Sequence, residues 1–157
     1  MGIATAQGLG AALGLPVRGV CTLDAIARGM AEAEAEGERL VVQDGFRGEV
    51  FAALYSAREE RLWEPAVYRP DRLLARLREL ETPPSVAGSG AVRFRGELTT
   101  DGVRIPDDAD PVHRVAARHV CALAAAAKGE AGQLAPIYLR PPDAERWRER
   151  DSFPTTE

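Results

Sequence analysis

Residues 39–55 read RLVVQDGFRGEVFAALY, and this stretch decides the fold. Its first part, Arg39–Asp44, has the apolar and β-branched content of a buried strand, and Glu49–Tyr55 resumes the extended character. A glycine-bearing turn at Gly45–Gly48 separates the two segments. Because Leu62–Tyr68 has the same extended character, we predict an antiparallel meander of three strands.

Helical patterns lie on both sides of this meander. Each has its own start or stop signal, such as an N-cap residue, an early proline or a following glycine. The predicted helices are Gly2–Gly14, Leu23–Glu36 capped by Thr22, a helix opening at Pro70 with leucines at 73, 74, 77 and 80, and a long helix Pro111–Ala127 capped by Asp110. Further short extended segments are expected at Val17–Val20, at Ser85–Gly90 and at Leu134–Leu139. Strands that alternate with helices predict an α/β or α+β protein.

Length and charge narrow the possible functions. The chain has 157 residues, 45% of them hydrophobic and 28% charged, which suits one soluble globular domain. Its net charge of −4 argues against a protein that holds nucleic acid by its own electrostatics, so any role with nucleic acid is expected to be indirect. We find neither a signal peptide nor an apolar run of the roughly 18 residues that a membrane span needs. A cytoplasmic protein is therefore expected.

The cysteines and histidines do not form a predicted site. Cys21 and Cys121 are 100 positions apart among apolar neighbours, so we expect two reduced, buried thiols, although a disulfide stays open. His113 and His119 fall on one predicted helix, about 240° apart around its axis, and cannot chelate one metal ion. We expect both histidines at the surface or half-buried.

Two other features suggest chemistry only weakly. Gly88-Ser89-Gly90 lacks the rest of a Walker motif or of a nucleophile elbow, so a tight turn is the better interpretation. Asp44 and Glu49 flank a turn, where paired carboxylates could bind a metal or act as acid and base, but Arg47 between them would neutralise them. The sequence therefore predicts no catalytic set, no metal site and no cofactor.

The first helix has an unusual surface. Gly2, Ala6, Gly10 and Gly14 recur every fourth residue, and each glycine costs about 1 kcal/mol relative to alanine within a helix. A nearly bare helix side lets another backbone approach closely. Two interpretations stay open: the helix packs tightly on its own sheet, or it also docks against a partner.

Several segments, in this order, resemble the TsaB (YeaZ) family. They are Gly2–Leu9, Leu15–Leu23, Asp44–Phe51, Val86–Gly90 and Pro136–Arg140. The resemblance implies an actin-like ATPase (ribonuclease-H-like) fold with two lobes. It also implies a non-catalytic dimerisation subunit that supports the paralogue TsaD, together with the ATPase TsaE. That machinery attaches threonylcarbamoyl to the adenosine beside the anticodon of tRNAs that read codons beginning with A.

The resemblance also implies where the partner binds. The family pairs through helices of its N-terminal lobe, and the helix Gly2–Gly14 matches the second of these. The implied interface residues are Gly2, Ile3, Ala6, Gln7, Gly10, Leu13 and Gly14. Contact with tRNA is expected only through the complex, and a homodimer is possible.

One departure from the family concerns the start of the chain. Family members have a strand-rich segment and a first helix ahead of the helix that begins here. We therefore expect residues 1–140 to be the C-terminal part of a two-lobed domain truncated at its N-terminus, with residues 141–157 a charged tail and pairing weakened. The alternative is an enzyme of the actin-like superfamily, a peptidase or a nucleotide hydrolase, supported only by Gly88–Gly90 and the Asp44/Glu49 pair.

Overall fold

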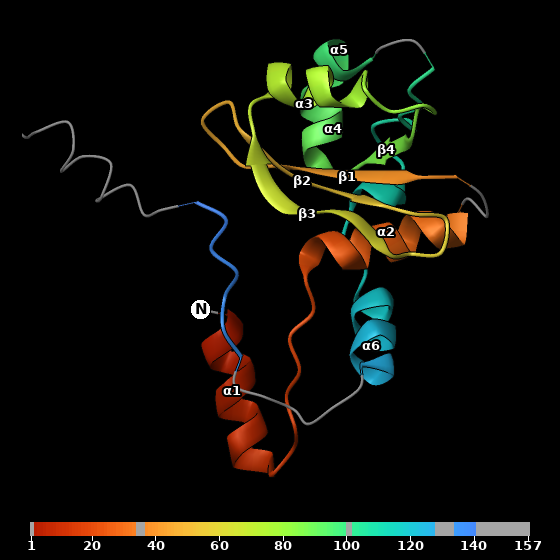
Figure 1. The fold of residues 1–157 in the computed structure, drawn as a ribbon. Coiled ribbons are helices and arrows are strands. Elements are labelled where there is room, and N and C mark those ends of the chain that lie inside the picture. Colours follow the sequence, from red (N-terminus) through yellow and green to blue (C-terminus); the bar gives the residue numbers. More distant parts are fainter. Residues whose placement is uncertain (1, 34–36, 100–101, 128–133, 141–157) are drawn as a thin grey trace, which may run out of the picture.

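The structure is a computed structural model that describes residues 2–33, 37–99, 102–127 and 134–140 (Figure 1). Two helices precede a run of three strands, and after one more helix and a fourth strand the remaining elements are helical. The elements are α1 (Gly2–Leu13), α2 (Thr22–Ala33), β1 (Arg39–Asp44), β2 (Val50–Tyr55), β3 (Arg61–Tyr68), α3 (Pro70–Leu77), β4 (Ser85–Ala87), α4 (Ser89–Arg93), α5 (Arg95–Leu98), the 3₁₀ turn η1 (Pro111–His113) and α6 (Ala117–Ala126).

The strands form one mixed sheet in the order β3-β2-β1-β4. β1 runs antiparallel to β2, with Val41 opposite Ala53, and β2 runs antiparallel to β3, so the predicted meander is confirmed. β4 lies parallel to β1, with Leu40 opposite Val86. A parallel neighbour needs a crossover connection, and the segment containing α3 provides it.

Both faces of the sheet are covered by helices (Figure 1). Alternation along β1 sends Leu40 and Val42 into the core beneath α3, α4 and α5, and Val41 into the core against α2. The α2 side also contains Ile26 and Met30, as the helical spacing predicted. Both faces of β1 are therefore apolar, which explains its unbroken hydrophobic run.

The predicted long helix over residues 111–127 is wrong in one respect: it is broken. Asp110 does cap its start, because the Val112 N–H donates to Asp110 Oδ1 over 2.8 Å. The chain then leaves helical geometry, with Arg114 at φ −117° and ψ 148°, before α6 begins. The break turns both His113 and His119 inward, whereas one continuous helix would have pointed them about 240° apart.

Two predicted extended segments form no strand in the described part of the chain. Residues 17–20 lead irregularly from α1 to α2, and residues 134–138 are also without regular structure. Neither joins the four-stranded sheet, because they lie beside α1 rather than at a sheet edge. Three predictions concern residues outside the described ranges: the end of the second helix at Glu36, the helix stop at 128–129 and the charged tail 141–157.

Within the described residues, no helix is both long and apolar enough to cross a membrane.

Candidate functional site

Helix α1, the predicted interface helix, stands apart from the sheet (Figure 1). Of its twelve residues only Gly10 is buried. Ile3 is 39% exposed, Leu9 58% and Leu13 65%, and Leu15 just beyond the helix is 59% exposed. The interpretation in which this helix packs on its own sheet is therefore wrong, because α1 contacts connecting segments instead.

Two of the predicted interface residues contact the chain itself. A Cβ at Gly10 would overlap Val17 Cγ2 and lie 3.0 Å from the Leu15 carbonyl oxygen. Gln7 donates from Nε2 to the Leu134 carbonyl oxygen over 3.2 Å. Because Gly10 has no side chain, α1 leaves room there for Leu15 and Val17, where the chain turns back along the helix.

The other predicted interface residues are open to varying degrees. Gly2, Ile3, Leu13 and Gly14 are exposed, and Ala6 is half-buried. Gly14 has φ +63° and ends the helix in the left-handed conformation that glycine adopts readily. Ile3, Leu9 and Leu13 are the large apolar side chains that α1 exposes.

The turn between β1 and β2 holds the two candidate carboxylates, and each has an arginine from a distant part of the chain. Arg93 of α4 lies 2.6 Å from Asp44 Oδ2, and Arg140 lies 3.0 Å from Glu49 Oε2. The sequence interpretation, which centred on Arg47, did not identify these two arginines. Groups of three or more potential metal-ligating side chains do not occur among the residues that the structure describes.

The prediction of a tight turn at Gly88-Ser89-Gly90 is correct only in part: Gly88 forms the sharp turn after β4, whereas Ser89 and Gly90 are already the first residues of helix α4. Gly88 has φ +116° and ψ 166°, and a Cβ there would overlap the Val42 carbonyl oxygen. Ser89 Oγ donates to Gln43 Oε1 over 2.8 Å and accepts from the Asp44 N–H over 3.1 Å. The two glycines permit the junction of β4 and α4 to approach β1 closely, and the Ser89 hydroxyl joins this junction to β1.

His113 fixes this turn from the other side. Its Nδ1 accepts from the Gly88 N–H over 3.1 Å, so the ring proton is on Nε2, which donates to the Asp107 carbonyl oxygen over 3.1 Å. The ring is 5% exposed. Because both ring nitrogens are engaged with the backbone, His113 is not placed as a base for Ser89.

His119 is also buried, at 2% exposure, so the expectation of surface or half-buried histidines is wrong for both. Its ring lies over Gly29 of α2, where a Cβ would be 3.1 Å from the imidazole Cε1. Its Nε2 is 3.5 Å from Glu32 Oε2. His119 therefore packs α6 against α2.

Both cysteines are free thiols. Cys21 is half-buried at the start of α2, whereas Cys121 is exposed on α6. The prediction of burial is wrong for Cys121, because α6 turns His119 rather than Cys121 toward α2.

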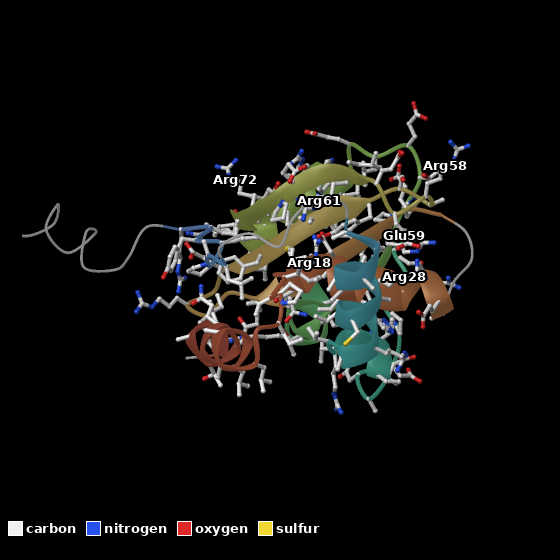
Figure 2. The ribbon with its side chains drawn as sticks, turned by 90° about the horizontal axis from the view of Figure 1, so that it is seen from below. Arg18, Arg28, Arg58, Glu59, Arg61 and Arg72 are labelled. Atoms are coloured by element: carbon white, nitrogen blue, oxygen red, sulfur yellow. The ribbon has the colours of Figure 1, made fainter. Side chains whose placement is uncertain are left out.

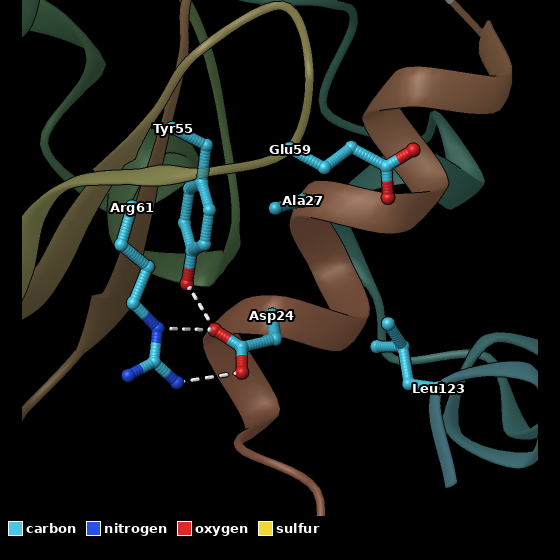
Figure 3. Close-up of a pocket in the computed structure, with 6 residues that line it drawn as sticks. All are labelled: Asp24, Ala27, Tyr55, Glu59, Arg61 and Leu123. Atoms are coloured by element: carbon cyan, nitrogen blue, oxygen red, sulfur yellow. Dashed lines mark hydrogen bonds and ion pairs between the residues drawn. The ribbon is translucent and has the colours of Figure 1, made fainter. Parts of the chain in front are cut away.

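A pocket that the sequence did not indicate lies between α2, α6 and the β2–β3 hairpin (Figure 3). Its volume is about 160 Å³. Tyr55 donates its hydroxyl hydrogen to Asp24 Oδ1 over 2.7 Å, and Arg61 holds the same carboxylate through two bonds of 2.9 and 2.6 Å. The pKa of Tyr55 is raised well above its ordinary value, mainly by burial and secondly by the hydrogen bond to Asp24.

The remaining walls of the pocket are Glu59, Ala27 and Leu123. Glu59 Oε1 accepts from Arg28 over 2.8 Å. The charged groups that line the pocket are thus bonded to protein partners, and the geometry is that of a network joining α2 to the hairpin. These residues are far apart in sequence, and no local motif could have brought them together.

The arginines labelled in Figure 2 do not form one basic face. In this view Arg58 and Arg72 lie on opposite sides of Arg61. Arg28 and Arg61 form ion pairs with acidic neighbours.

Comparison with known proteins identifies the family to which this chain belongs. Residues 1–137 match the model of the TsaD family, described as tRNA N6-adenosine threonylcarbamoyltransferase. The uncharacterized protein Rv3421c of Mycobacterium tuberculosis H37Rv is 34% identical over 143 residues, which is 91% of this chain and 58% of that protein. The chain therefore spans little more than half the length of this relative.

Two solved structures share the fold. YeaZ from Pseudomonas aeruginosa superposes with a TM-score of 0.64 at 23% identity, covering 87% of this chain and 66% of that one. A P. aeruginosa protein described as uncharacterized, with similarity to peptidase YeaZ, gives a TM-score of 0.66 at 24% identity over 88% of this chain and 66% of its own.

The mixed sheet with helices on both faces is thus an α/β domain of the actin-like, ribonuclease-H-like class. Within that class, the chain belongs to the TsaD family of tRNA-modification proteins. The resemblance to TsaB (YeaZ) proteins is confirmed at the level of family and fold.

Proposed function

We propose that this chain is a non-catalytic scaffold subunit that pairs, through α1, with a TsaD-type partner that carries out threonylcarbamoylation of the anticodon-adjacent adenosine in tRNA. The observation that carries the proposal is the exposure of large apolar side chains on a helix that does not pack on its own sheet. A contiguous apolar surface of this kind marks a protein interaction site.

The apolar side chains are arranged for docking. Ala6, Leu9 and Leu13 follow the spacing that places residues on one helix face. Leu9 and Leu13 are each more than half exposed, so contact with a partner would remove much apolar area from water. Leu9 therefore joins the interface residues implied by the family resemblance.

The state of the candidate chemical groups favours a scaffold over an enzyme. Asp44 and Glu49 are each neutralised by an arginine, which lowers their value as acid and base. Ser89 is bonded to Gln43 and the Asp44 backbone, while the nearby His113 is engaged elsewhere. A nucleophile needs an adjacent base, and this arrangement does not supply one.

The experiment is a calorimetric titration of the chain with a TsaD-type protein. Leu13→Asp buries a charge in the proposed contact and is expected to weaken binding at least about tenfold. Leu62→Asp is the matched control, because Leu62 is 48% exposed on β3, away from α1. The proposal would be refuted if the unaltered chain did not bind, or if both variants lost affinity to the same extent.

The wider assembly follows from the same proposal. The ATPase TsaE is the expected third component, and tRNA is contacted through the complex rather than by this chain alone. Without its partner, the apolar face of α1 is available to a second copy of the chain. Light scattering with and without the TsaD-type protein measures this exchange.

The rival function is an actin-like-superfamily enzyme, either peptidase-like or a nucleotide hydrolase. A phosphate-release assay on the purified chain, with Asp44→Ala for comparison, separates it from the scaffold. Turnover by the chain that this substitution abolishes would favour the enzyme.

A further inference from the structure

Among the described residues, the segment Leu134–Arg140 contacts two separate parts of the molecule, helix α1 at one end and the turn between β1 and β2 at the other. It begins beside α1 and continues toward the sheet (Figure 1). At no more than about 3.3 Å per residue, seven residues can span up to roughly 20 Å. The segment therefore reaches from the middle of α1 to the turn between β1 and β2.

Its first anchor is on α1 and the linker that follows. Gln7 donates to the Leu134 carbonyl oxygen over 3.2 Å. The Leu134 side chain lies against Gly19, where a Cβ would come within 2.8 Å of Leu134 Cδ2. Glycine at position 19 thus makes room for Leu134.

Its second anchor is the ion pair of Arg140 with Glu49, at 3.0 Å. The two side chains are only 25% and 20% exposed, so solvent screens this pair less than a surface pair. The Glu49 backbone is held within the turn, since Gly45 N–H donates to its carbonyl oxygen and its own N–H donates to Phe46. Arg140 is therefore bonded to a fixed point of the sheet.

Helix α1 depends on these anchors for its orientation. Its own covalent connection to α2 runs through residues 14–21, which have no helix or strand after the turn at Gly14. Only Gly10 of the helix is buried. A helix with one irregular linker and one fully buried residue is weakly held by its own packing, whereas a second attachment restricts its movement.

We propose that Glu49 and Arg140 are positioning residues, forming a latch that fixes the direction of α1 relative to the sheet and so presents its apolar face to the partner. The effect on partner binding rests on the function proposed above; the effect on α1 orientation does not. Neither residue touches the partner in this account. Both act through the segment 134–140.

The first measurement follows the orientation of α1 in the full chain. Spin labels are attached at Ala11→Cys on α1 and Arg72→Cys on α3, in a background with Cys21→Ser and Cys121→Ser. Glu49→Gln is expected to broaden the distance distribution, and the exchange Glu49→Arg with Arg140→Glu to narrow it again. Asp44→Asn is the matched control, because it removes a charge from the same turn but breaks a pair with Arg93.

The second measurement is the affinity for a TsaD-type protein. Glu49→Gln is expected to raise Kd by roughly threefold to tenfold, because a smaller fraction of the chain is then in the binding orientation. The charge exchange is expected to restore it, and Asp44→Asn to leave it unchanged.

The outcomes separate the two proposals. If the distance distribution responds to Glu49→Gln but no form of the chain binds the partner, the latch stands and the proposed function fails. An unchanged distribution overturns the latch, whatever the affinity. A broadened distribution with unchanged affinity also overturns it, because the orientation of α1 would then not determine binding.

Discussion

Replacement of Gly88 by alanine is expected to destabilise the domain severely. Gly88 sits at the end of β4 with φ +116° and ψ 166°, a backbone conformation that is essentially restricted to glycine. A Cβ would overlap the Val42 carbonyl oxygen and lie 2.9 Å from its carbonyl carbon. Val42 is fully buried in β1, so neither partner of the contact can move freely.

The magnitude follows from two costs. The backbone conformation costs an alanine on the order of 1–3 kcal/mol. Relief of the overlap requires a displacement within the close-packed β1–β4 contact, which adds about 1–3 kcal/mol. A total near 4 kcal/mol is a large part of the roughly 5–15 kcal/mol that stabilises an ordinary domain.

Gly48→Ala is the matched control for this substitution. Gly48 also has a positive φ, +76°, but no atom lies within 4 Å of the position of a Cβ. It therefore incurs only the cost of the left-handed conformation, about 1–2 kcal/mol. Urea unfolding followed by circular dichroism measures both variants. If Gly88→Ala costs no more than Gly48→Ala, the close packing of this turn on β1 is refuted.

Two further predictions concern a buried hydroxyl and an exposed thiol. Tyr55→Phe removes the bond to Asp24 and is expected to cost about 1 kcal/mol at neutral pH. Above about pH 10 the tyrosine loses its proton in the unfolded chain, whereas in the folded chain it keeps the proton because burial raises the pKa of Tyr55. The free energy of unfolding of the unaltered chain therefore falls by up to about 1.4 kcal/mol per pH unit relative to that of the variant. Urea unfolding at pH 9 and 11 checks this, and a parallel pH dependence of the two proteins would contradict it. Cys121 is expected to react with a maleimide before Cys21, because it is exposed, and mass spectrometry that finds the reverse order would refute the orientation of α6.

Local patterning predicted the centre of the fold. The meander follows from two apolar runs on either side of a glycine turn, and α3 from its proline start and leucine spacing. These features depend on residues close together in the chain. The apolar run Leu40–Val42 also predicts that β1 is a buried strand, and both of its faces are buried.

Contacts between distant residues account for what the sequence did not predict. Beside the break in the helix predicted over 111–127, His113 bonds to the Gly88 backbone, 25 residues away, and helix propensity contains no information about that contact. The arginines that neutralise Asp44 and Glu49 are 49 and 91 residues away in the chain. The same holds for Asp24, Tyr55 and Arg61 in the pocket.

The sequence does not determine the position of α1, for a different reason. Its glycines and alanines indicate close approach of another backbone but do not identify which one. The structure shows that Gly10 meets the chain at Leu15 and Val17, while Leu9 and Leu13 face solvent. Sequence spacing alone could not divide the helix into an internal side and an exposed one.

The most direct test of the scaffold account is hydrogen–deuterium exchange of the chain with and without a TsaD-type protein. The account predicts slower exchange of amides in α1, residues 2–13, when the partner is present, and unchanged exchange in the edge strand β3, residues 61–68. Unchanged exchange in α1, or protection confined to the sheet edge, would contradict it.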